Sequence, residues 1–196
     1  MLNFYGKKII LGSTSPRRKE LLSIIINEFD ISAPHYQENN NIASVPEKIC
    51  ILHAYNKARS LIEKHPDAWI ISADTIVVKN GKILGKPANE KDAYNMLKNL
   101  SGDKHFVYTA YCILNSNNGK YIQGIEKTEV IFRKIDDNLI NFYIKNYTPY
   151  DKAGSYGIQD FSAVFIDKIN GCFFNVVGFP IPNFYHNVRK NLIRCL

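Results

Sequence analysis

The 196-residue chain lacks any apolar run long enough to cross a membrane. Two apolar runs stand out, at 9–11 and at 21–26, and Ser23 interrupts the second. Both are far shorter than the roughly 20 residues of a membrane-spanning helix and are also too short for the apolar core of a signal peptide. We therefore expect a cytoplasmic protein with no membrane partner.

Cysteine is scarce and widely scattered. The chain contains no C-x-x-C pair and no histidine pair at the spacing of zinc ligands. This argues against a zinc site and against a disulfide framework, and it predicts reduced structural thiols. The four cysteines are Cys50, Cys112, Cys172 and Cys195.

Several catalytic motifs are also missing. The absence of G-x-x-x-x-G-K-[ST] excludes a P-loop nucleotidase, and no G-x-G-x-x-G follows the first apolar segment. Neither the G-x-S-x-G nucleophile elbow nor the H-E-x-x-H metalloprotease motif occurs. His53 and His105 have no evident partner in the sequence, so we expect structural or surface roles for both.

The charge balance is basic. Lys and Arg number 25 against 18 Asp and Glu, which gives a formal net charge of +7. Such a balance suits nucleic acid, a membrane surface or a phosphorylated ligand, and composition does not choose among them. A solvated, mildly basic surface would also explain it.

Strand-like and helix-like segments alternate, which predicts an α/β protein with a mixed sheet and one sizeable core. An Asn80-Gly81 turn predicts a hairpin, and the sequence 44–47 has the form of a capping box. Strands are expected at 69–78, 82–84, 106–114, 121–135 and 163–169. Helices are expected from Pro16, after the capping box, after Asn89, after Asp136 or Asp137, and after Pro182.

The segment after the first apolar run has an unusual charge pattern. Three hydroxyl residues, 13–15, precede Pro16, which suits a first helical position, and three cations follow at 17–19. Cations at a helix start oppose the macrodipole, unless they share an anion with the free backbone amides. A phosphate fits this arrangement, and an ordinary capped helix with solvated arginines is the alternative.

Asp74 lies within the apolar segment 69–78. A buried carboxylate needs a cation, a metal or a proton, because leaving it unpaired costs several kcal/mol, roughly. A raised pKa would make Asp74 a general base, and an adjacent metal would keep it ionised as a ligand. The alternative is a strand-end aspartate that accepts hydrogen bonds from the backbone.

Two lysines and one glutamine are further candidates. Lys57 interrupts an apolar helical stripe, although it could equally snorkel to solvent. Lys86, next to a proline, could direct a charge toward a phosphate or be an ordinary loop lysine. Gln159 ends a glycine-containing connector and offers a donor and an acceptor that suit a pyrimidine edge, and a flexible surface turn is the alternative.

Taken in order, these segments resemble the Maf family of nucleotide pyrophosphatases over nearly the whole chain. The resemblance implies one domain, 1–196, with an inosine-triphosphatase-like α/β fold. A long mixed β-sheet flanked by helices would form two lobes around a central cleft, and the protein would be a homodimer. The matching segments are 13–22, 57–58, 73–77, 85–87, 100–102, 107–110 and 151–159.

The resemblance also implies a reaction. The family cleaves nucleoside triphosphates between the α and β phosphates, with a divalent metal such as Mg²⁺ or Mn²⁺, to the monophosphate and pyrophosphate. The S-P-R-R sequence at 15–18 and the G-I-Q sequence at 157–159 are similar to the branch specific for dTTP and UTP. The branch acting on 7-methyl-GTP is less similar at these positions.

Site residues follow from the same resemblance. Asp74 would be the proton acceptor and, with Glu38, a metal ligand, although Gln37 and Asn39 replace further acids of the family pattern. Choice of the base would fall to Arg17, Thr75 and Gln159. Phosphate binding would fall to Ser13, Arg18, Lys57 and Lys86.

A binding protein is the alternative from a different class. The net charge of +7 suits a nucleic-acid-binding protein, and the resemblance adds an association with cell division. The aromatic residues, however, are spread through strands and do not cluster with Lys and Arg as a stacking platform would require. We therefore expect a nucleoside triphosphate as the partner and no stable nucleic-acid complex.

Overall fold

The computed structural model describes residues 2, 4, 6–40 and 43–192. The chain divides into two compact units, which are described separately below. Unit 1 comprises residues 1–74, 109–126 and 178–196, and unit 2 comprises residues 75–108 and 127–177. Each of three long strands contributes residues to both units: β3 (Ala68–Lys79), β5 (Lys104–Asn115) and β6 (Tyr121–Phe132).

The strands form one mixed sheet. In the described part of the chain it has seven strands in the order β2-β1-β3-β5-β6-β7, with β4 paired to β3. β1 pairs in parallel with β2 and β3, whereas β4 and β7 pair antiparallel with β3 and β6. The predicted α/β class with a long mixed sheet is thereby confirmed. The remaining strands are β1 (Lys8–Leu11), β2 (Asp30–Ile31), β4 (Lys82–Leu84) and β7 (Ile166–Asn170).

The hairpin between β3 and β4 is formed as the sequence predicts. Asn80 has φ 50° and Gly81 has φ 76°, the left-handed conformation that both central residues of a two-residue hairpin turn require. This turn brings Lys82 opposite Lys79.

Three helices belong to unit 1: α1 (Pro16–Ser23), α2 (Pro46–Arg59) and α6 (Ile181–Asn191). The predicted capping box before α2 is wrong, because Val45 is the N-cap residue and makes no side-chain cap bond. Pro46 explains the difference. It occupies the first helical turn, where its missing N–H costs nothing, and it holds the preceding residue in an extended conformation.

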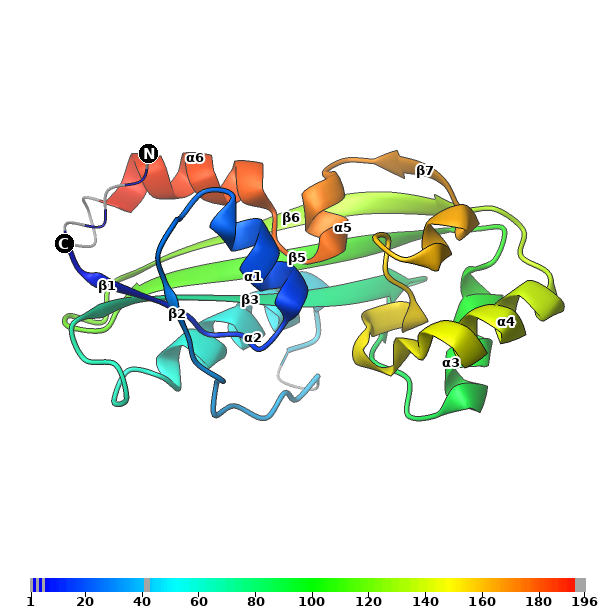
Figure 1. Cartoon of the computed structure of the whole chain (residues 1–196), viewed down its shortest axis with the longest axis horizontal. Coiled ribbons are helices and arrows are strands. Elements are labelled where there is room, and N and C mark those ends of the chain that lie inside the picture. The colour runs from blue at the N-terminus through cyan, green and yellow to red at the C-terminus, as the bar shows by residue number, and fades with distance from the viewer. Residues whose placement is uncertain (1, 3, 5, 41–42, 193–196) are drawn as a thin grey trace. The chain divides into compact units, whose positions relative to one another are not determined.

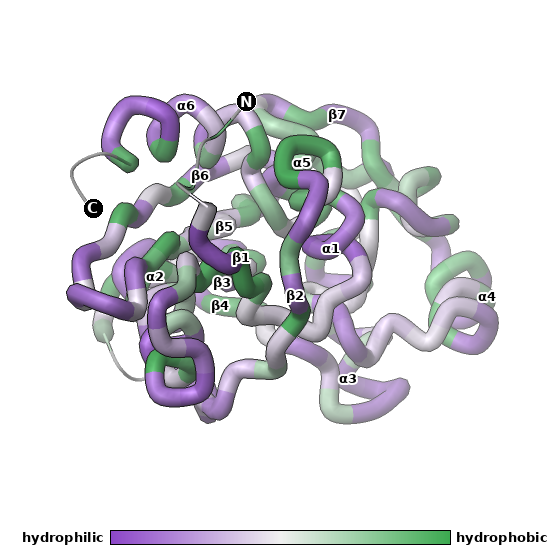
Figure 2. Tube along the Cα trace, turned by 60° about the vertical axis from the view of Figure 1, so that its left-hand side comes forward, coloured by the Kyte–Doolittle hydropathy of each residue, from purple (hydrophilic) through white to green (hydrophobic). Residues whose placement is uncertain are grey.

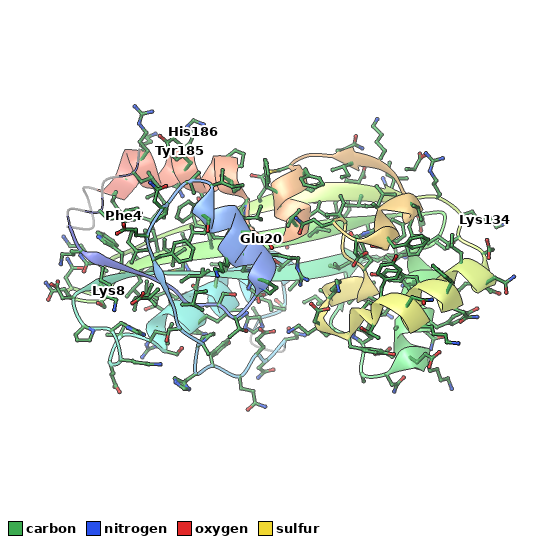
Figure 3. The ribbon with its side chains drawn as sticks, viewed as in Figure 1. Phe4, Lys8, Glu20, Lys134, Tyr185 and His186 are labelled. Atoms are coloured by element: carbon green, nitrogen blue, oxygen red, sulfur yellow. The ribbon has the colours of Figure 1, made fainter. Side chains whose placement is uncertain are left out.

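The core of unit 1 is apolar and aromatic. Trp69 on β3 is fully buried, and the ring of Phe4 meets it edge-on at a centroid distance of 6.3 Å. Phe184 and Val188 bury one side of α6, and Figure 2 shows the resulting alternation of apolar and polar segments along that helix. Tyr185 and His186 project from its outer side (Figure 3). Cys195, one of the four expected structural thiols, lies outside the described residues.

Tyr111 and Gly124 make a close contact across unit 1. A Cβ atom placed on Gly124 would lie 2.2 Å from the hydroxyl oxygen and 2.4 Å from Cζ of Tyr111. The same hydroxyl donates to Asn183 Oδ1 at 2.8 Å and accepts from Asn187 Nδ2 at 2.8 Å. Glycine at 124 therefore makes room for a ring that ties β5 to α6.

Two capped helices lie side by side in unit 2 (Figure 1): α3 (Glu90–Leu100) and α4 (Asp137–Tyr147). Asn89 Oδ1 accepts from the backbone N–H of Asp92 at 3.0 Å. Asp136 Oδ1 accepts from the backbone N–H of Leu139 at 2.9 Å. Both predicted caps are confirmed, with Asp136 as the second N-cap.

The expected strand at 163–169 begins later than predicted. Residues Phe161–Phe165 form the short helix η3, and β7 starts at Ile166. Asp160 is the cause, because its Oδ1 accepts from the N–H of Ser162 at 2.9 Å and so caps a helical turn. Other short helices of unit 2 are η1 (Pro149–Asp151), η2 (Ala153–Ser155) and α5 (Phe173–Val177).

Exposed ion pairs join neighbouring elements of unit 1. Lys8 on β1 lies 2.5 Å from Asp30 on β2, and Figure 3 labels Lys8 at this position. Across the residues described, no helix combines the length and apolarity needed to traverse a bilayer.

Candidate active site

The start of α1 leaves its backbone amides without a side-chain cap. Ser15 is the N-cap residue, makes no side-chain cap bond, and is followed by Pro16 at the first position. No acidic residue lies in the first turn of this helix. The hydroxyl of Ser13 accepts from the Ser15 N–H at 3.2 Å. This geometry fits the predicted anion site, because helix N-termini attract negative charge.

Arg18 turns back from α1 toward the loop that follows β1. Its Nε donates to the Gly178 carbonyl at 3.1 Å, and its Nη1 lies 3.5 Å from Ser13 Oγ. Desolvation lowers the pKa of Arg18, while the charges of Asp74, Cys50 and Glu38 act in the opposite direction. The guanidinium and the Asp74 carboxylate therefore interact electrostatically within unit 1.

A lysine joins two carboxylates at the centre of unit 1. Lys57 Nζ lies 2.6 Å from Asp74 Oδ1 and 2.7 Å from Glu38 Oε1. The Lys57 and Asp74 side chains are only 9% and 5% exposed, whereas that of Glu38 is 45% exposed. Burial of this kind requires each charge to have a partner, since an uncompensated buried charge is strongly destabilising.

These contacts decide between the alternatives that the sequence left open for Lys57 and for Asp74. Lys57 does not snorkel to solvent, because it is buried against Asp74. Asp74 is not at a strand end, because β3 continues to Lys79, and Asp74 Oδ1 takes its hydrogen bond from Lys57. Of the three partners expected for a buried Asp74 carboxylate, a cation, a metal or a proton, the structure shows a cation.

The second carboxylate oxygen of Asp74, Oδ2, is buried and has no hydrogen-bond partner. Such an oxygen can accept a proton or bind a cation. No cluster of three or more His, Cys, Asp or Glu side chains suited to a metal occurs among the residues described. Two carboxylates nevertheless fit Mg²⁺, which typically takes one or two protein carboxylates and completes its shell with phosphate oxygens and water.

Cys50 is a contact of Asp74 that the sequence did not indicate. Its thiol donates to the Asp74 carbonyl at 3.2 Å and accepts from the Ala110 N–H at 3.3 Å. Burial, followed by the charge of Asp74, raises the pKa of Cys50 well above its ordinary value. Cys50 is therefore a buried, protonated thiol that ties α2 to β3 and β5, as the prediction of structural thiols requires.

His53 has hydrogen-bond contacts that the sequence did not indicate. It is fully buried on α2, and its ring nitrogens lie 2.8 Å from Tyr36 Oη and 3.3 Å from Asn40 Oδ1. Of the two roles expected for His53, structural or surface, its buried position supports the structural one. Its partners are 17 and 13 residues away, a separation that no sequence pattern marks.

The predicted site residues divide between the two units. Unit 1 brings together Ser13, Arg18, Glu38, Lys57 and Asp74, and it also holds the half-buried Arg17. The residues of unit 2 are the half-buried Thr75, the exposed Lys86 and the exposed Gln159.

The turn before Gln159 is closed by hydrogen bonds. Ser162 Oγ accepts from the Gly157 N–H at 3.0 Å and donates to the Gly157 carbonyl at 2.8 Å. The Asp160 N–H donates to the same carbonyl at 2.9 Å. Gln159 is therefore held between bonded neighbours in a defined turn, while its own side chain is exposed.

Residues 8–191 match the family described as Maf-like protein. The dTTP/UTP pyrophosphatase of Pyrococcus furiosus is 46% identical over 179 residues, which cover 89% of this chain and 90% of that protein. The dTTP/UTP pyrophosphatase of Thermococcus kodakarensis is 47% identical over 174 residues, or 88% and 91% of the two chains. A protein of the same name from Clostridium botulinum strain Alaska E43 is 44% identical, with 89% and 94% covered.

Similarity to solved structures is weaker. A nucleoside-triphosphatase, or dITP/XTP pyrophosphatase, from Mycobacterium abscessus superposes with a TM-score of 0.41 at 15% identity and covers 65% of this chain and 75% of that one. The family match over most of the chain is far more extensive. On that match, and on relatives above 40% identity along nearly their whole length, the chain belongs to the Maf-like protein family.

Proposed function

We propose that this chain is a nucleoside triphosphate pyrophosphatase that hydrolyses dTTP and UTP to the monophosphate and pyrophosphate. The observation that carries the proposal is the buried Lys57–Asp74 pair, which has a guanidinium within electrostatic range and one carboxylate oxygen still without a partner. Relatives named dTTP/UTP pyrophosphatase, at 41–47% identity, support the choice of substrate.

Cationic groups would bind the triphosphate. A nucleoside triphosphate carries up to about four negative charges, and Arg18, Lys57 and the uncapped amides of α1 offer complementary charge within unit 1. Ser13 would contribute its hydroxyl, and Lys86 of unit 2 is proposed as a further phosphate contact. These groups also stabilise the charge that develops on the departing pyrophosphate.

Asp74 would accept the proton of the attacking water. Its Oδ1 is held by Lys57, so its Oδ2 is the oxygen available for this transfer. As the water oxygen bonds to phosphorus, its proton passes to Asp74 Oδ2, and the α–β phosphoanhydride P–O bond breaks. Pyrophosphate and the nucleoside monophosphate are then the products.

Glu38 and Asp74 would hold the divalent cation, Mg²⁺ or Mn²⁺. Both carboxylates contact one ammonium nitrogen, so they lie close enough together to bind one cation. When bound, the cation supplies Lewis-acid charge neutralisation at the phosphate oxygens. Glu38 would bring its partly exposed carboxylate to this position.

Choice of the nucleobase is assigned to Arg17, Thr75 and Gln159. The carboxamide of Gln159 offers a donor and an acceptor side by side, which matches the edge of a pyrimidine. Its side chain is exposed in unit 2 and so is accessible to a ligand. The homodimer and the cytoplasmic location implied by the family resemblance stay predictions, and sedimentation of the purified protein would measure the first.

Substrate turnover tests the proposal directly. We expect the purified protein, with Mg²⁺ or Mn²⁺, to release pyrophosphate from dTTP and UTP faster than from CTP or 7-methyl-GTP. Asp74→Asn, which keeps the size of the side chain but removes the proton acceptor, should lower the rate about 10³-fold while the melting transition survives. A fully active Asp74→Asn protein would contradict the role of Asp74, and preference for 7-methyl-GTP would contradict the role of Gln159.

A further inference from the structure

Glu38 lies on a segment that has no regular secondary structure to hold it. Residues 32–39 contain neither helix nor strand, so their course depends on side-chain and loop contacts. One anchor is the His35 N–H, which donates to Ser60 Oγ at 3.1 Å. A second anchor holds residues on both sides of Glu38 in the sequence.

His53 provides that second anchor. The Tyr36 hydroxyl lies 2.8 Å from His53 Nδ1, and Asn40 Oδ1 lies 3.3 Å from His53 Nε2. Tyr36 and Asn40 are placed two residues before and two residues after Glu38. The two ring nitrogens of one fully buried histidine therefore hold both sides of the Glu38 position.

The partners indicate which nitrogen of the neutral His53 ring carries the hydrogen. Asn40 Oδ1 can only accept, so His53 Nε2 carries the hydrogen and donates it. In the neutral ring Nδ1 then accepts from the Tyr36 hydroxyl. Asn56 Nδ2 lies 3.3 Å from the same hydroxyl oxygen and donates to it. His53 Nε2, the Tyr36 hydroxyl and Asn56 Nδ2 thus each donate to a partner in this group.

His53 and Ser60, which anchor segment 32–40, lie on the same face of α2 as Lys57. His53, Asn56, Lys57 and Ser60 are spaced by three, one and three positions, and residues three and four apart are neighbours on a helix surface. Ser60 Oγ also donates to the Lys57 carbonyl at 2.9 Å. The face that holds segment 32–40 is thus the face from which Lys57 reaches Glu38 and Asp74.

We propose that His53 is a positioning residue for Glu38: by holding Tyr36 and Asn40, it fixes the Glu38 carboxylate beside Lys57 and Asp74, where the divalent cation would bind. This inference rests on the proposed function for the role of the cation. The link between His53 and the Glu38 segment rests on the contacts alone. Residues that orient ligands of a metal typically change its affinity 10- to 100-fold when they are replaced.

The test compares His53→Leu with His53→Gln and with a matched control. Leucine fills the volume without polar groups, whereas glutamine restores one donor and one acceptor. Asn187→Ala removes a comparable hydrogen-bond network of unit 1, to Tyr111 and the Gln123 carbonyl, that does not involve segment 32–40. Two quantities are measured on each full-length protein: amide hydrogen exchange of peptides covering 35–40, and the Mn²⁺ concentration that gives half-maximal dTTP hydrolysis.

We expect His53→Leu to speed exchange in 35–40 and to raise the half-maximal Mn²⁺ concentration about tenfold, with kcat at saturating Mn²⁺ within about twofold. His53→Gln should recover part of both changes, and Asn187→Ala should show neither. Glu38→Gln should itself weaken activation by Mn²⁺. Adding His53→Leu to it should cause no further loss, because both substitutions act on one carboxylate.

Three results would overturn the inference: unchanged exchange and Mn²⁺ dependence in His53→Leu, the same changes in Asn187→Ala, or full additivity of His53→Leu with Glu38→Gln. Failure of the proposed function is distinguishable. A wild-type protein that hydrolyses no triphosphate contradicts the proposed function. In that case amide hydrogen exchange in 35–40 alone tests whether His53 positions Glu38. Faster exchange in His53→Leu would still support the positioning of Glu38, and unchanged exchange would overturn it.

Discussion

Among the residues that the structure describes, each unit has one buried lysine, and the two lysines have different partners. Lys57 in unit 1 contacts two carboxylates, of which the Asp74 carboxylate is itself buried. Lys79 in unit 2 donates to the Asn99 carbonyl in the last turn of α3 and lies 2.9 Å from the exposed carboxylate of Asp103. Both side chains are less than a tenth exposed.

The difference lies in what each ammonium neutralises. Lys79 donates to a carbonyl at the C-terminus of α3, where a cation complements the helix macrodipole. Its second partner, the Asp103 carboxylate, is exposed, and water could solvate that carboxylate as well. Lys57 offsets a carboxylate whose side chain is only 5% exposed. A buried cation alone therefore does not indicate function. A buried cation beside a buried acid that has an unpartnered oxygen does indicate a functional site.

The largest expected effect is a loss of activity when Lys57 is replaced. Lys57→Met keeps the length of the side chain and removes the charge, so kcat/KM for dTTP should fall about 10²- to 10³-fold, as when one charged stabilising group is lost. Lys79→Met is the matched control and should leave kcat/KM within about threefold. Steady-state pyrophosphate release from both proteins measures the contrast. Equal losses would show that the two lysines do not differ in role.

Lys79→Met should instead lower the free energy of unfolding by about 1–3 kcal/mol. The substitution removes a charged hydrogen bond to the Asn99 carbonyl and leaves that carbonyl at a helix end without its donor. Urea denaturation followed by circular dichroism gives the free energy. Stability equal to wild type would mean that the Asn99 carbonyl finds another donor.

In unit 2, the charge of Lys79 also affects how the free energy of unfolding depends on pH, through His105. Burial, followed by the charge of Lys79, lowers the pKa of His105 to about 3. Because the folded pKa lies below the unfolded value of about 6.5, this group adds stability above pH 6.5 that is lost as pH falls toward 3. The loss is about 1.4 kcal/mol for each pH unit below 6.5.

His105→Gln is the variant that tests this assignment. Glutamine does not titrate, and it offers a polar group to Tyr156 Oη, which lies 2.7 Å from His105 Nε2. Unfolding free energies measured between pH 7 and pH 5 should fall less steeply in this variant than in wild type. Identical slopes in the two proteins would assign the loss to other groups.

The smallest expected effect comes from an exposed lysine. Lys98 pairs with Asp137 between α3 and α4, and both side chains are more than half exposed. Lys98→Gln should shift the melting temperature by less than about 1 °C, since exposed ion pairs contribute little. Differential scanning calorimetry is sensitive enough to detect a larger shift, which would place Lys98 with the buried lysines.

Local chemistry made much of the fold predictable. The Asn80-Gly81 hairpin and the cap at Asn89 depend on neighbours within about four residues, and both are formed as expected. The capping box failed because Pro46 sets its own preference for the first helical turn. The strand at 163–169 was overestimated because the Asp160 side chain captures the Ser162 N–H and starts a helical turn.

Prediction of the site had a different limit. The apolar surroundings of Asp74 required a cation, a metal or a proton beside it. That the partner is Lys57 depends on packing between residues 17 positions apart in the chain. The family resemblance supplied what spacing could not, namely the pairing of Glu38 with that site. His53 was missed because Tyr36 and Asn40 lie on an irregular segment that carries no periodic signal.

The close approach of Gly124 and Tyr111 constrains how this sequence can diverge. Any side chain at position 124 would overlap the ring itself, so removing the hydroxyl alone leaves too little room. A smaller residue must first replace Tyr111, and that change would remove one hydrogen-bond partner from each of Asn183 and Asn187 on α6. We therefore expect the effects of substitutions at these four positions, 111, 124, 183 and 187, to depend on one another.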